Sequence, residues 1–435
     1  MGSDLRRRVS SRHHPSLLPT FPSDANSLLF ADDVLPMRVA EPNDQLVIGF
    51  RWLSEQRDRA DATVFDVARE LTGDLAKTLR QMGHEVIETA SPHNAPCSSL
   101  LRRCDVVHSY AVGDVPLDLS PETMWDGAHP YTGAPGGPAR IGSIFAAIET
   151  ESERLPQSQG NRPGFDGFHR EFAGADLLSY SRAQANSIDR YRTMWGVSPE
   201  FASVVPPGLD LGRYPFEATP DNYLAAVSDF QPGCGLDHAI ELATRVGIPM
   251  RFAGTIASIE QRRYFAEEIR PLLTSGVEYV GSLDRDERIK FLGRARGYVE
   301  LGWRRYPFDL CALEALAGGT PVISTQSGAA GELVSHEVNG FLASTPGSLI
   351  SAILALDRID RNRCRHEVER SHNVERSALE FEAFYYNVLD RNRAMASIPR
   401  RPKNEFGKVT TTALALANQS AHARSDAGFM AQRLN

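Results

Sequence analysis

Short apolar runs alternate with longer segments of helical period along most of the chain. In the first half, apolar runs predict strands at residues 45–50, 85–89, 105–109 and 141–148. Between the first two, residues 64–82 carry apolar residues at helical spacing, and Gly83 ends this segment. Strand, loop, helix and strand is the order that opens a doubly wound α/β domain. The first half is therefore predicted to be Rossmann-like.

The second half repeats the alternation, with strands predicted at residues 223–227, 250–254, 277–281 and 297–301. Pro307 suits the first turn of a further helix, in which Leu310 and Leu313 lie at helical spacing. The pair Gly318–Gly319 ends this helix, and a buried strand begins at Val322. We therefore predict a second Rossmann-like domain, and an α/β fold for the whole chain.

Glu314 is the one charged residue inside the apolar turns of this helix. A carboxylate in such a position needs a partner, because burying an unpaired charge is costly. Either the hydroxyl of a ligand or a nearby arginine would satisfy it.

The periodicity also divides the chain. Residues 1–44 mix Ser, Pro, Arg and Asp without a period, which predicts a loose arm. The first domain is expected over residues 45–215 and the second over 216–380. Residues 381–395 predict a closing helix that returns to the first domain, and 396–435 a disordered tail that could dock a partner protein.

Composition narrows the class of protein. The 435 residues hold 47 basic and 55 acidic side chains, a net charge of −8, which argues against a general nucleic-acid binder. No apolar run approaches the roughly 20 residues that span a bilayer, and Met1–Pro15 lacks the apolar core of a signal peptide. The five cysteines lack Cys-x-x-Cys spacing, which favours a reduced compartment without structural zinc. We expect a cytoplasmic protein, and the excess of Arg over Lys suggests a bacterial genome of high GC content.

Residues 306–323 resemble the donor-binding motif of GT-B glycosyltransferases, in particular the large family 4 of retaining enzymes. In that family a Glu, then Gly-Phe-Gly-Leu, then a second Glu eight residues after the first, lie at the donor site. The second Glu corresponds to Glu314, and the Gly-Thr-Pro-Val turn to residues 319–322. Tyr306 stands in place of the first Glu, and Asp309 in place of the second Gly.

The resemblance covers roughly residues 45–393 and implies the GT-B fold, two Rossmann-like domains that face each other across a cleft. The first domain would take the acceptor and the second the donor. Residues 175–181 resemble the family's strand that ends in a helix-capping Ser, here Ser181, before a helix over 183–194. Residues 204–210 match the crossing to the second domain.

Two cations neutralise the leaving diphosphate in this family, an Arg and, five residues later, a Lys followed by Gly. Here Asp229 and Cys234 take these positions, and Gly235 follows. Two unit charges about 4 Å apart interact by roughly 4 kcal/mol at an effective dielectric of about 20, so exchanging attraction for repulsion is a large change. Asp309 adds to it, because a carboxylate there would satisfy the helix N-terminus internally and repel a phosphate.

Other donor-side candidates follow from the same alignment. Glu314 would hold the ribose hydroxyls, and the strand end from Tyr279 to Gly281 would line the base pocket. Phe308 and Leu310 occupy the motif's turn. Arg304 and Arg305 could replace the missing cations, or else be solvated or bond Glu314 or Asp309. Cys234 could be a reactive thiol at a helix start, or a small buried filler.

His108 and Glu149 are the catalytic candidates, because they end adjacent strands and would point at the cleft by the switch-point rule. Family members often have a His at the second of these strand ends, where Glu149 stands here. A Glu there could act as a general base or bond a sugar hydroxyl. The alternatives are a core-edge histidine for His108 and a helix-capping carboxylate for Glu149.

The resemblance implies a retaining glycosyltransferase that uses no metal or other cofactor. It would move a sugar from a nucleotide-activated donor, of an unusual kind if the diphosphate clamp is lost, to a small-molecule or glycan acceptor in bacterial biosynthesis. One alternative is a degenerate GT-B protein without turnover that acts as a helper subunit. Another is a pseudo-glycosyltransferase that forms a C–N or C–S bond.

Overall fold

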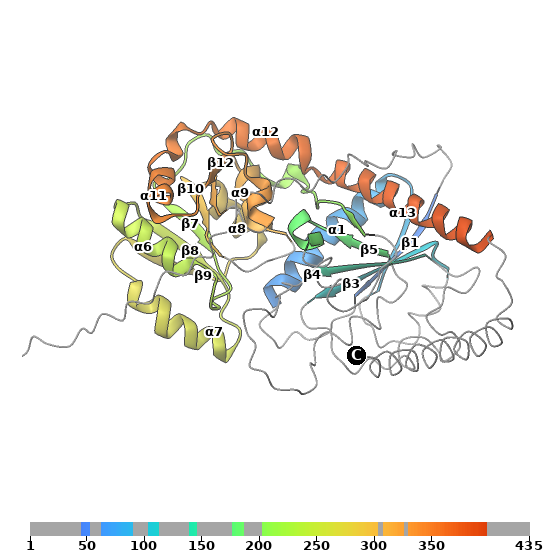
Figure 1. The fold of residues 1–435 in the computed structure, drawn as a ribbon, viewed down its shortest axis with the longest axis horizontal. Coiled ribbons are helices and arrows are strands. Elements are labelled where there is room, and N and C mark those ends of the chain that lie inside the picture. The colour runs from blue at the N-terminus through green and yellow to red at the C-terminus, as the bar shows by residue number, and fades with distance from the viewer. Residues whose placement is uncertain are drawn as a thin grey trace, which may run out of the picture. The chain divides into compact units, whose positions relative to one another are not determined.

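The computed structural model describes residues 45–52, 62–89, 103–112, 139–145, 176–186, 202–302, 308–325 and 329–397. These residues form two six-stranded sheets (Figure 1), and both sheets fall within one compact unit of the chain. The predicted arm at 1–44 lies outside the described residues. So does the predicted tail at 396–435, except for its first two residues, which end a helix.

The first sheet contains β1 (Val47–Trp52), β2 (Glu85–Thr89), β3 (Val106–Val112), β4 (Ala139–Phe145), β5 (Asp176–Ser179) and β6 (Ala202–Val204). Its order is β2-β1-β3-β4-β5-β6, and every neighbouring pair is parallel. The order reverses between β1 and β3, as in a doubly wound sheet. The short strand β6 was not predicted from the sequence pattern.

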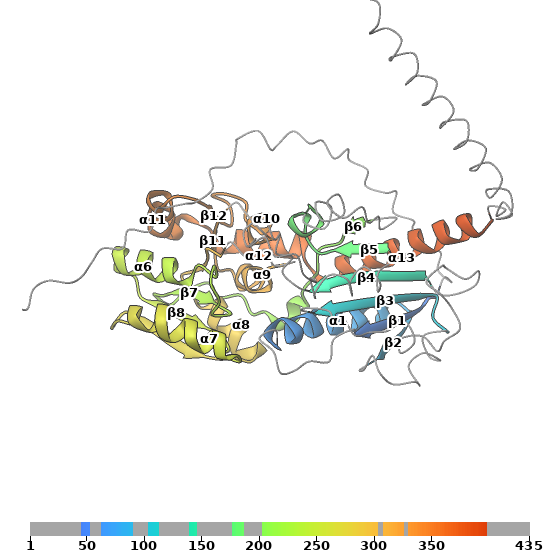
Figure 2. The ribbon, with the colours of Figure 1, turned by 60° about the horizontal axis from the view of Figure 1, so that its bottom comes forward.

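The second sheet contains β7 (Leu224–Val227), β8 (Met250–Ala253), β9 (Val277–Gly281), β10 (Gly297–Glu300), β11 (Val322–Ser324) and β12 (Gly340–Leu342). Its order is β12-β11-β10-β7-β8-β9, again parallel throughout. The reversal lies between β7 and β10. Figure 2 shows the first sheet most clearly, with β3 between β4 and β1. Two parallel, doubly wound sheets confirm the predicted α/β fold with two Rossmann-like domains.

Helices connect and cover these strands. They are α1 (Ala62–Gln81), α6 (Leu236–Val246), α7 (Ile259–Tyr264), α8 (Arg285–Gly293), α9 (Leu310–Ala317), α10 (Ala329–Leu333), α11 (Pro346–Leu354), α12 (Arg361–Ser371) and α13 (Val374–Ser397). Short turns of other helical type lie at Leu211–Arg213, Phe265–Ile269, Arg270–Leu272 and Leu356–Arg358. A short helix at 182–186 begins where Ser181 Oγ accepts a hydrogen bond from Gln184 N (3.1 Å), as the predicted Ser cap requires.

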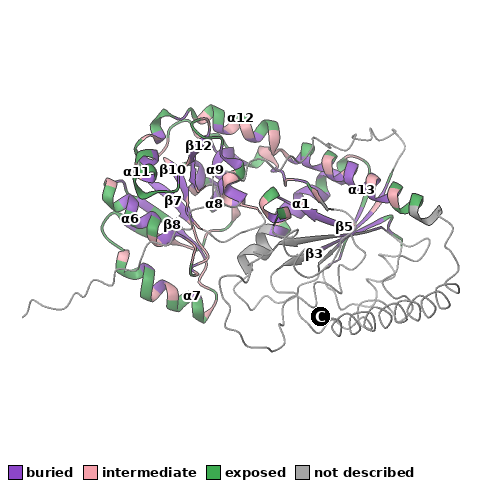
Figure 3. Cartoon of the chain, in the orientation of Figure 1, coloured by how far each residue is buried: buried purple, intermediate pink, exposed green. Residues whose placement is uncertain are grey.

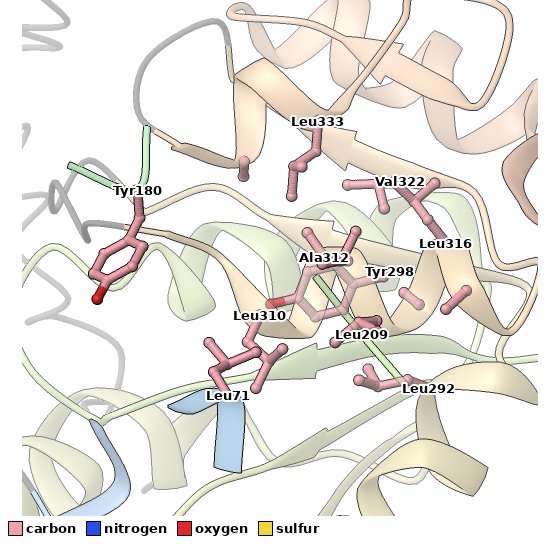
Figure 4. Packing of buried hydrophobic residues seen from close by; sticks show 14 of the residues in the cluster. Leu71, Tyr180, Leu209, Leu292, Tyr298, Leu310, Ala312, Leu316, Val322 and Leu333 are labelled. Carbon is pink, nitrogen blue, oxygen red and sulfur yellow. The ribbon is translucent and has the colours of Figure 1, made fainter. Parts of the chain in front are cut away.

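The apolar residues of α9 explain why its sequence is almost continuously hydrophobic. The helix packs against α8, α12, β10 and β11, so it is covered on several sides. Figure 4 shows Leu310, Ala312 and Leu316 among the side chains that pack with Tyr298 and Val322. Figure 3 shows that most residues of β7, β8 and β10 are buried, whereas helices such as α6, α11 and α12 also carry exposed residues. A charged residue in α9 therefore has little access to water.

Several predicted boundaries need correction. α9 begins at Leu310 rather than near Pro307, because Asp309 caps it. α13 begins at Val374 rather than 381, since Asn373 Oδ1 accepts a hydrogen bond from Arg376 N (2.7 Å) and starts the helix early. β4 begins at Ala139 rather than 141, and residues 146–148 of the predicted strand lie outside the described residues.

The closing helix predicted at 381–395 lies within α13, which contacts α1 and β4 of the first sheet. His84 links the first sheet to α13. Its Nδ1 accepts a hydrogen bond from Leu46 N (3.2 Å), directly before β1, and its Nε2 lies 2.8 Å from Glu382 Oε1 on α13.

The two connections between the sheets run side by side. Leu209 N donates to His372 O (2.9 Å), and Val374 N donates to Leu209 O (3.0 Å). Gly208 permits this approach, because a Cβ there would lie 2.2 Å from Asn373 O. The chain thus passes twice through one narrow crossing.

Candidate functional site

The carboxyl ends of β7 and β10 form the switch point of the second sheet, where doubly wound sheets bind ligands. Asp229 follows β7 closely, and Glu300 ends β10. The two loops touch, because a Cβ on Gly302 would lie 3.2 Å from Cys234 O. The fold therefore brings the predicted residues Asp229, Cys234 and Gly235 to the loop that follows Glu300.

Gly235 occupies the tightest point of this contact. Its φ is +70°, the left-handed region, and it stands at the N-cap of α6. A Cβ would lie 2.5 Å from Leu301 C and 2.7 Å from Gly302 N. Only glycine fits both the backbone conformation and the approach of the neighbouring loop.

Gly235→Ala should lower the free energy of unfolding by about 3 kcal/mol, because a left-handed residue with a Cβ costs roughly 1–2 kcal/mol and overpacking about 1–3 kcal/mol. Gly247→Ala is the matched control, since Gly247 has a φ of +71° but a Cβ there would meet open space, with nothing within 4 Å. It should cost only the conformational part, about 1 kcal/mol. Urea denaturation measures both, and equal losses would show that the contact with residues 301–302 is unimportant.

The thiol of Cys234 is half-buried and donates to Tyr264 Oη (3.7 Å). Burial raises the pKa of this thiol, and hydrogen bonds from its surroundings offset the effect only in part. A thiol with a raised pKa holds little thiolate, and the thiolate is the reactive form. The geometry favours the small filler over the reactive thiol.

Carboxyl groups gather beside this point. Asp309 Oδ1 accepts a hydrogen bond from Ala312 N (2.8 Å), so Asp309 satisfies the N-terminus of α9 as predicted. Glu300 Oε1 accepts from Gly302 N (2.8 Å), and Tyr298 Oη donates to Glu300 Oε2 (3.3 Å). Burial, and then the charge of Asp309, raise the pKa of Glu300, while burial raises that of Asp309. A phosphate at this helix end would meet carboxyl groups in place of free amides.

Glu314 is fully enclosed and bonded within the protein. Arg288 Nε donates to Glu314 Oε2 (2.7 Å) and Arg288 Nη2 to Oε1 (3.1 Å). Tyr214 Oη also donates to Oε1 (3.0 Å). Of the roughly four lone-pair positions of a carboxylate, three are taken. The sequence analysis left two possible partners for Glu314, a ligand hydroxyl or a nearby arginine. Arg288 is that arginine.

Arg288 and its neighbour Arg285 also bond α1. Arg288 Nη2 donates to Glu70 Oε2 (2.9 Å), and Arg285 Nη2 donates to Asp74 Oδ2 (2.6 Å). Burial raises the pKa of Glu70, against the opposing charges of both arginines. None of these four residues was a sequence-based candidate. The sequence does show two acids four residues apart in one predicted helical segment and two arginines three residues apart in another. This spacing places each pair on one helix face, but it does not predict that the two helices meet.

Tyr279 belongs to an aromatic cluster at the ends of β8 and β9. Its ring stacks on Phe252, with centroids 5.4 Å apart and planes at 23°. Its hydroxyl donates to Gly254 O (2.7 Å). Phe308 is half-buried with its ring 6.2 Å from that of His372, and Leu310 is buried as the first residue of α9. Glu149, Arg304, Arg305 and Tyr306 lie outside the described residues.

The sequence pattern predicts His108 at the end of its strand, and this prediction is wrong. β3 continues to Val112, so His108 lies within the sheet and is 0% exposed. Its Nδ1 lies 3.0 Å from Tyr385 Oη and 3.2 Å from Tyr110 Oη. Phe50 and Phe381 pack around the ring. The histidine is part of the core beneath α13.

Burial lowers the pKa of His108 to about 3, from 6.5. Between these values the unfolded chain binds a proton that the folded protein excludes, so this contribution to stability is complete above pH 6.5 and is lost as the pH falls. From pH 7 to pH 5, wild type should lose about 2 kcal/mol more than His108→Gln. Urea denaturation of both proteins at pH 7 and pH 5 measures these losses. Subtracting the loss of the variant from that of wild type cancels the contribution of the other titrating groups. If the free energy of unfolding changed with pH in the same way in both proteins, the burial of a neutral His108 would be contradicted.

Among the described residues, no group of three or more His, Cys, Asp or Glu side chains is placed to hold a metal ion. Within the same residues, no helix is both long and apolar enough to cross a bilayer.

Comparisons with known proteins show similarity to glycosyltransferases in sequence and in fold. Residues 235–358 match the model of the family "Glycosyl transferases group 1". The chain is 30% identical to N-acetyl-alpha-D-glucosaminyl L-malate synthase of Bacillus anthracis over 135 residues, 27% of this chain and 35% of that protein. It is 26% identical to MMP alpha-(1->4)-mannosyltransferase of Mycolicibacterium hassiacum over 187 residues, 42% of this chain and 45% of that protein. The match thus spans less than half the length of either relative.

Among solved structures, the fold is similar to that of AviGT4, a glycosyltransferase involved in avilamycin A biosynthesis. The TM-score is 0.54 at 20% identity, over 79% of this chain and 98% of that one. The chain therefore has the GT-B fold of glycosyltransferases, and its residues 235–358 are similar to glycosyl transferases group 1.

Proposed function

We propose that this protein is a glycosyltransferase that moves a sugar from a nucleotide-activated donor to a small-molecule or glycan acceptor. One observation carries the proposal. Gly235, Tyr279 and α9 with Glu314 all lie in the segment that is similar to glycosyl transferases group 1, and the first two are placed at the carboxyl edge of the second sheet. Doubly wound sheets bind their ligands at this edge.

In this proposal the reaction retains the configuration of the sugar and requires no metal. The second sheet takes the nucleotide and the first takes the acceptor. The names of the two relatives, an N-acetyl-alpha-D-glucosaminyl L-malate synthase and an MMP alpha-(1->4)-mannosyltransferase, are consistent with sugar transfer to different acceptors. We further propose that the protein acts in the cytoplasm of a bacterium.

The donor would differ from the usual one in how its phosphates are held. Asp229 and Cys234 replace two expected cations, and Asp309 occupies the N-terminus of α9. Anion binding at that helix end is thereby weakened. Arg304 and Arg305 are the remaining candidates for a phosphate clamp. A donor with less phosphate charge, or a C–N or C–S coupling of a sugar-like unit, fits the same arrangement.

The test is a thermal-shift panel of GDP, UDP, ADP, CMP and TDP with their sugar conjugates. A ligand at about 100 times its dissociation constant should stabilise the folded protein by about 2.7 kcal/mol. The nucleotide that raises the melting temperature names the donor, and Arg304→Gln with Arg305→Gln then tests the clamp. If no nucleotide or sugar conjugate changed the melting temperature, the proposal of nucleotide-sugar transfer would be wrong.

A non-catalytic GT-B helper is the second candidate, and a specific observation favours it. The N-terminus of α9 and the carboxylate of Glu314 are both satisfied by the protein's own groups. A helper of this kind would bind no nucleotide and would copurify with an active transferase, with residues 396–435 as the docking segment. Turnover by the isolated protein with any donor would exclude it.

A further inference from the structure

The contact between α1 and α8 is built from charge. It joins one side chain pair on α1, Glu70 and Asp74, to a pair on α8, Arg285 and Arg288. We propose that these four residues form a clasp that holds the two sheet-bearing halves together, and that it can open. The two helices are remote in sequence, so nothing but tertiary contact holds them here.

The spacing of the four residues suits a helix-to-helix contact. Glu70 and Asp74 lie four residues apart, and Arg285 and Arg288 three apart, so each pair shares one helix face. Each arginine reaches α1: Arg288 Nη2 lies 2.9 Å from Glu70 Oε2, and Arg285 Nη2 lies 2.6 Å from Asp74 Oδ2. Arg285 Nε is also 3.4 Å from Glu70 Oε2, which links the two pairs into one network.

The clasp is shielded from water. The side-chain exposures are 23% for Glu70, 12% for Asp74, 11% for Arg285 and 10% for Arg288. Charges this shielded lose hydration, so the pairs add less net stability than apolar packing would, although an unpaired member is strongly unfavourable. The contact is therefore specific without being strongly cohesive. These are the properties of an interface that separates and re-forms in one register.

Two residues position the arginines from behind. Glu314 takes two hydrogen bonds from Arg288, and Tyr214 Oη lies 3.4 Å from Arg285 Nη2 while donating to Glu314. Both stay with the second sheet when α1 moves away. The guanidinium groups thus remain oriented for Glu70 and Asp74 in the open form.

A second polar contact joins the halves, beside the apolar side chains of Leu71, Leu209 and Leu310, which belong to one buried cluster. Glu332 of α10 accepts hydrogen bonds from Arg182 N (2.9 Å) and Ala183 N (2.6 Å) beside the first sheet. The adjacent chain crossings at Leu209 and Asn373 provide a narrow pivot. Two chain crossings that lie side by side are the arrangement of a hinge, and motion between domains is the default expectation unless their interface is large and hydrophobic.

The clasp has a consequence that rests on the proposed function. Arg288 is shared between Glu70 and Glu314, so opening concentrates its donors on Glu314. A nucleotide that uses Glu314 would therefore bind more weakly to the open form, and loss of Glu70 should weaken it. The clasp itself does not depend on nucleotide binding.

Pulsed electron paramagnetic resonance tests the clasp in the full-length protein. Spin labels go on cysteines introduced at Gln81, exposed at the end of α1, and at Ile259, which is 82% exposed at the start of α7. Glu70→Gln with Asp74→Asn removes two charges at almost constant shape, and Asp74→Lys introduces repulsion. Both variants should give a broader distance distribution with a longer mean than wild type.

Asp357→Asn is the matched control, because Asp357 forms a surface pair with Arg296 within the second half. It should leave the distance distribution unchanged. Wild-type distributions in both clasp variants, or an equal shift in the control, would overturn the clasp. Nucleotide titration of the same proteins separates the two proposals: if no nucleotide binds but the clasp variants open, the proposed function fails and the clasp stands.

Discussion

Replacing Arg361 with Met is expected to lower the free energy of unfolding by about 4 kcal/mol, roughly a thousandfold in the unfolding equilibrium. Arg361 uses its guanidinium entirely within the second half. Nε donates to Glu217 O (2.6 Å), Nη1 to Ala295 O (3.0 Å), and Nη2 to Gly293 O (2.5 Å) and to Thr320 Oγ1 (2.9 Å). These acceptors belong to the segment after the crossing and to the ends of α8 and α9.

The reason for the large loss is that the acceptors on Gly293, Ala295 and Thr320 stay buried. Thr320 is 0% exposed, and Met offers no donor to the carbonyl groups around it. Each unsatisfied buried group costs about 1–3 kcal/mol, and relaxation or entering water recovers part of the sum. Burial also lowers the pKa of Arg361, as expected for a charge held by neutral carbonyls rather than by a carboxylate.

Urea denaturation measures the loss, with Arg363→Met as the control because Arg363 is an exposed residue of the same helix. The control should change the stability by less than about 0.5 kcal/mol. Arg361→Lys should fall between the two, since one ammonium group cannot reach acceptors spread around a planar guanidinium. A loss below about 1 kcal/mol for Arg361→Met would mean that water replaces the arginine.

Glu314→Leu should destabilise the protein by about 3–5 kcal/mol, because it leaves Arg288 buried without its closest carboxylate. The side chain of Glu314 is 0% exposed and that of Arg288 10% exposed. Adding Arg288→Met to Glu314→Leu should restore most of the stability, since well-packed apolar residues often replace a buried ion pair at little cost. The comparison is again made by urea denaturation.

The pair of variants also separates two roles of Glu314. A simple Glu314→Ala experiment mixes the loss of a nucleotide contact with damage to the fold. In the proposed function, the stable double variant still fails to bind the nucleotide that stabilises wild type. If the double variant binds nucleotide as wild type does, Glu314 is a structural residue that orients Arg288. No recovery in the double variant would instead show that the cavity, and not the lone charge, causes the loss.

The local pattern of the chain was sufficient for most of the elements and for their order, although the three-residue strands β6 and β12 were not predicted. β2 and β9 have the predicted bounds because each is an apolar run closed by polar or glycine residues. Asp309 was recognised as satisfying a helix end, because capping depends on the few residues that follow. Two repeats of the strand and helix alternation were enough to predict two Rossmann-like domains.

The pattern did not determine which buried groups meet. His108 was expected at a strand end, but β3 continues, and Phe381 and Tyr385 of α13 cover it from a distant part of the chain. The carboxylate of Glu314 was known to need a partner, and the packing of α8 on α9 selects Arg288.

The contact of Arg288 with Glu70 joins residues 218 positions apart. Periodicity reports which face of an element is buried, whereas the pairing of charges depends on which elements that burial brings together. The sequence by itself thus determined most of the elements and the two-domain α/β fold. The burial of His108, the partner of Glu314 and the clasp were decided only by the tertiary structure.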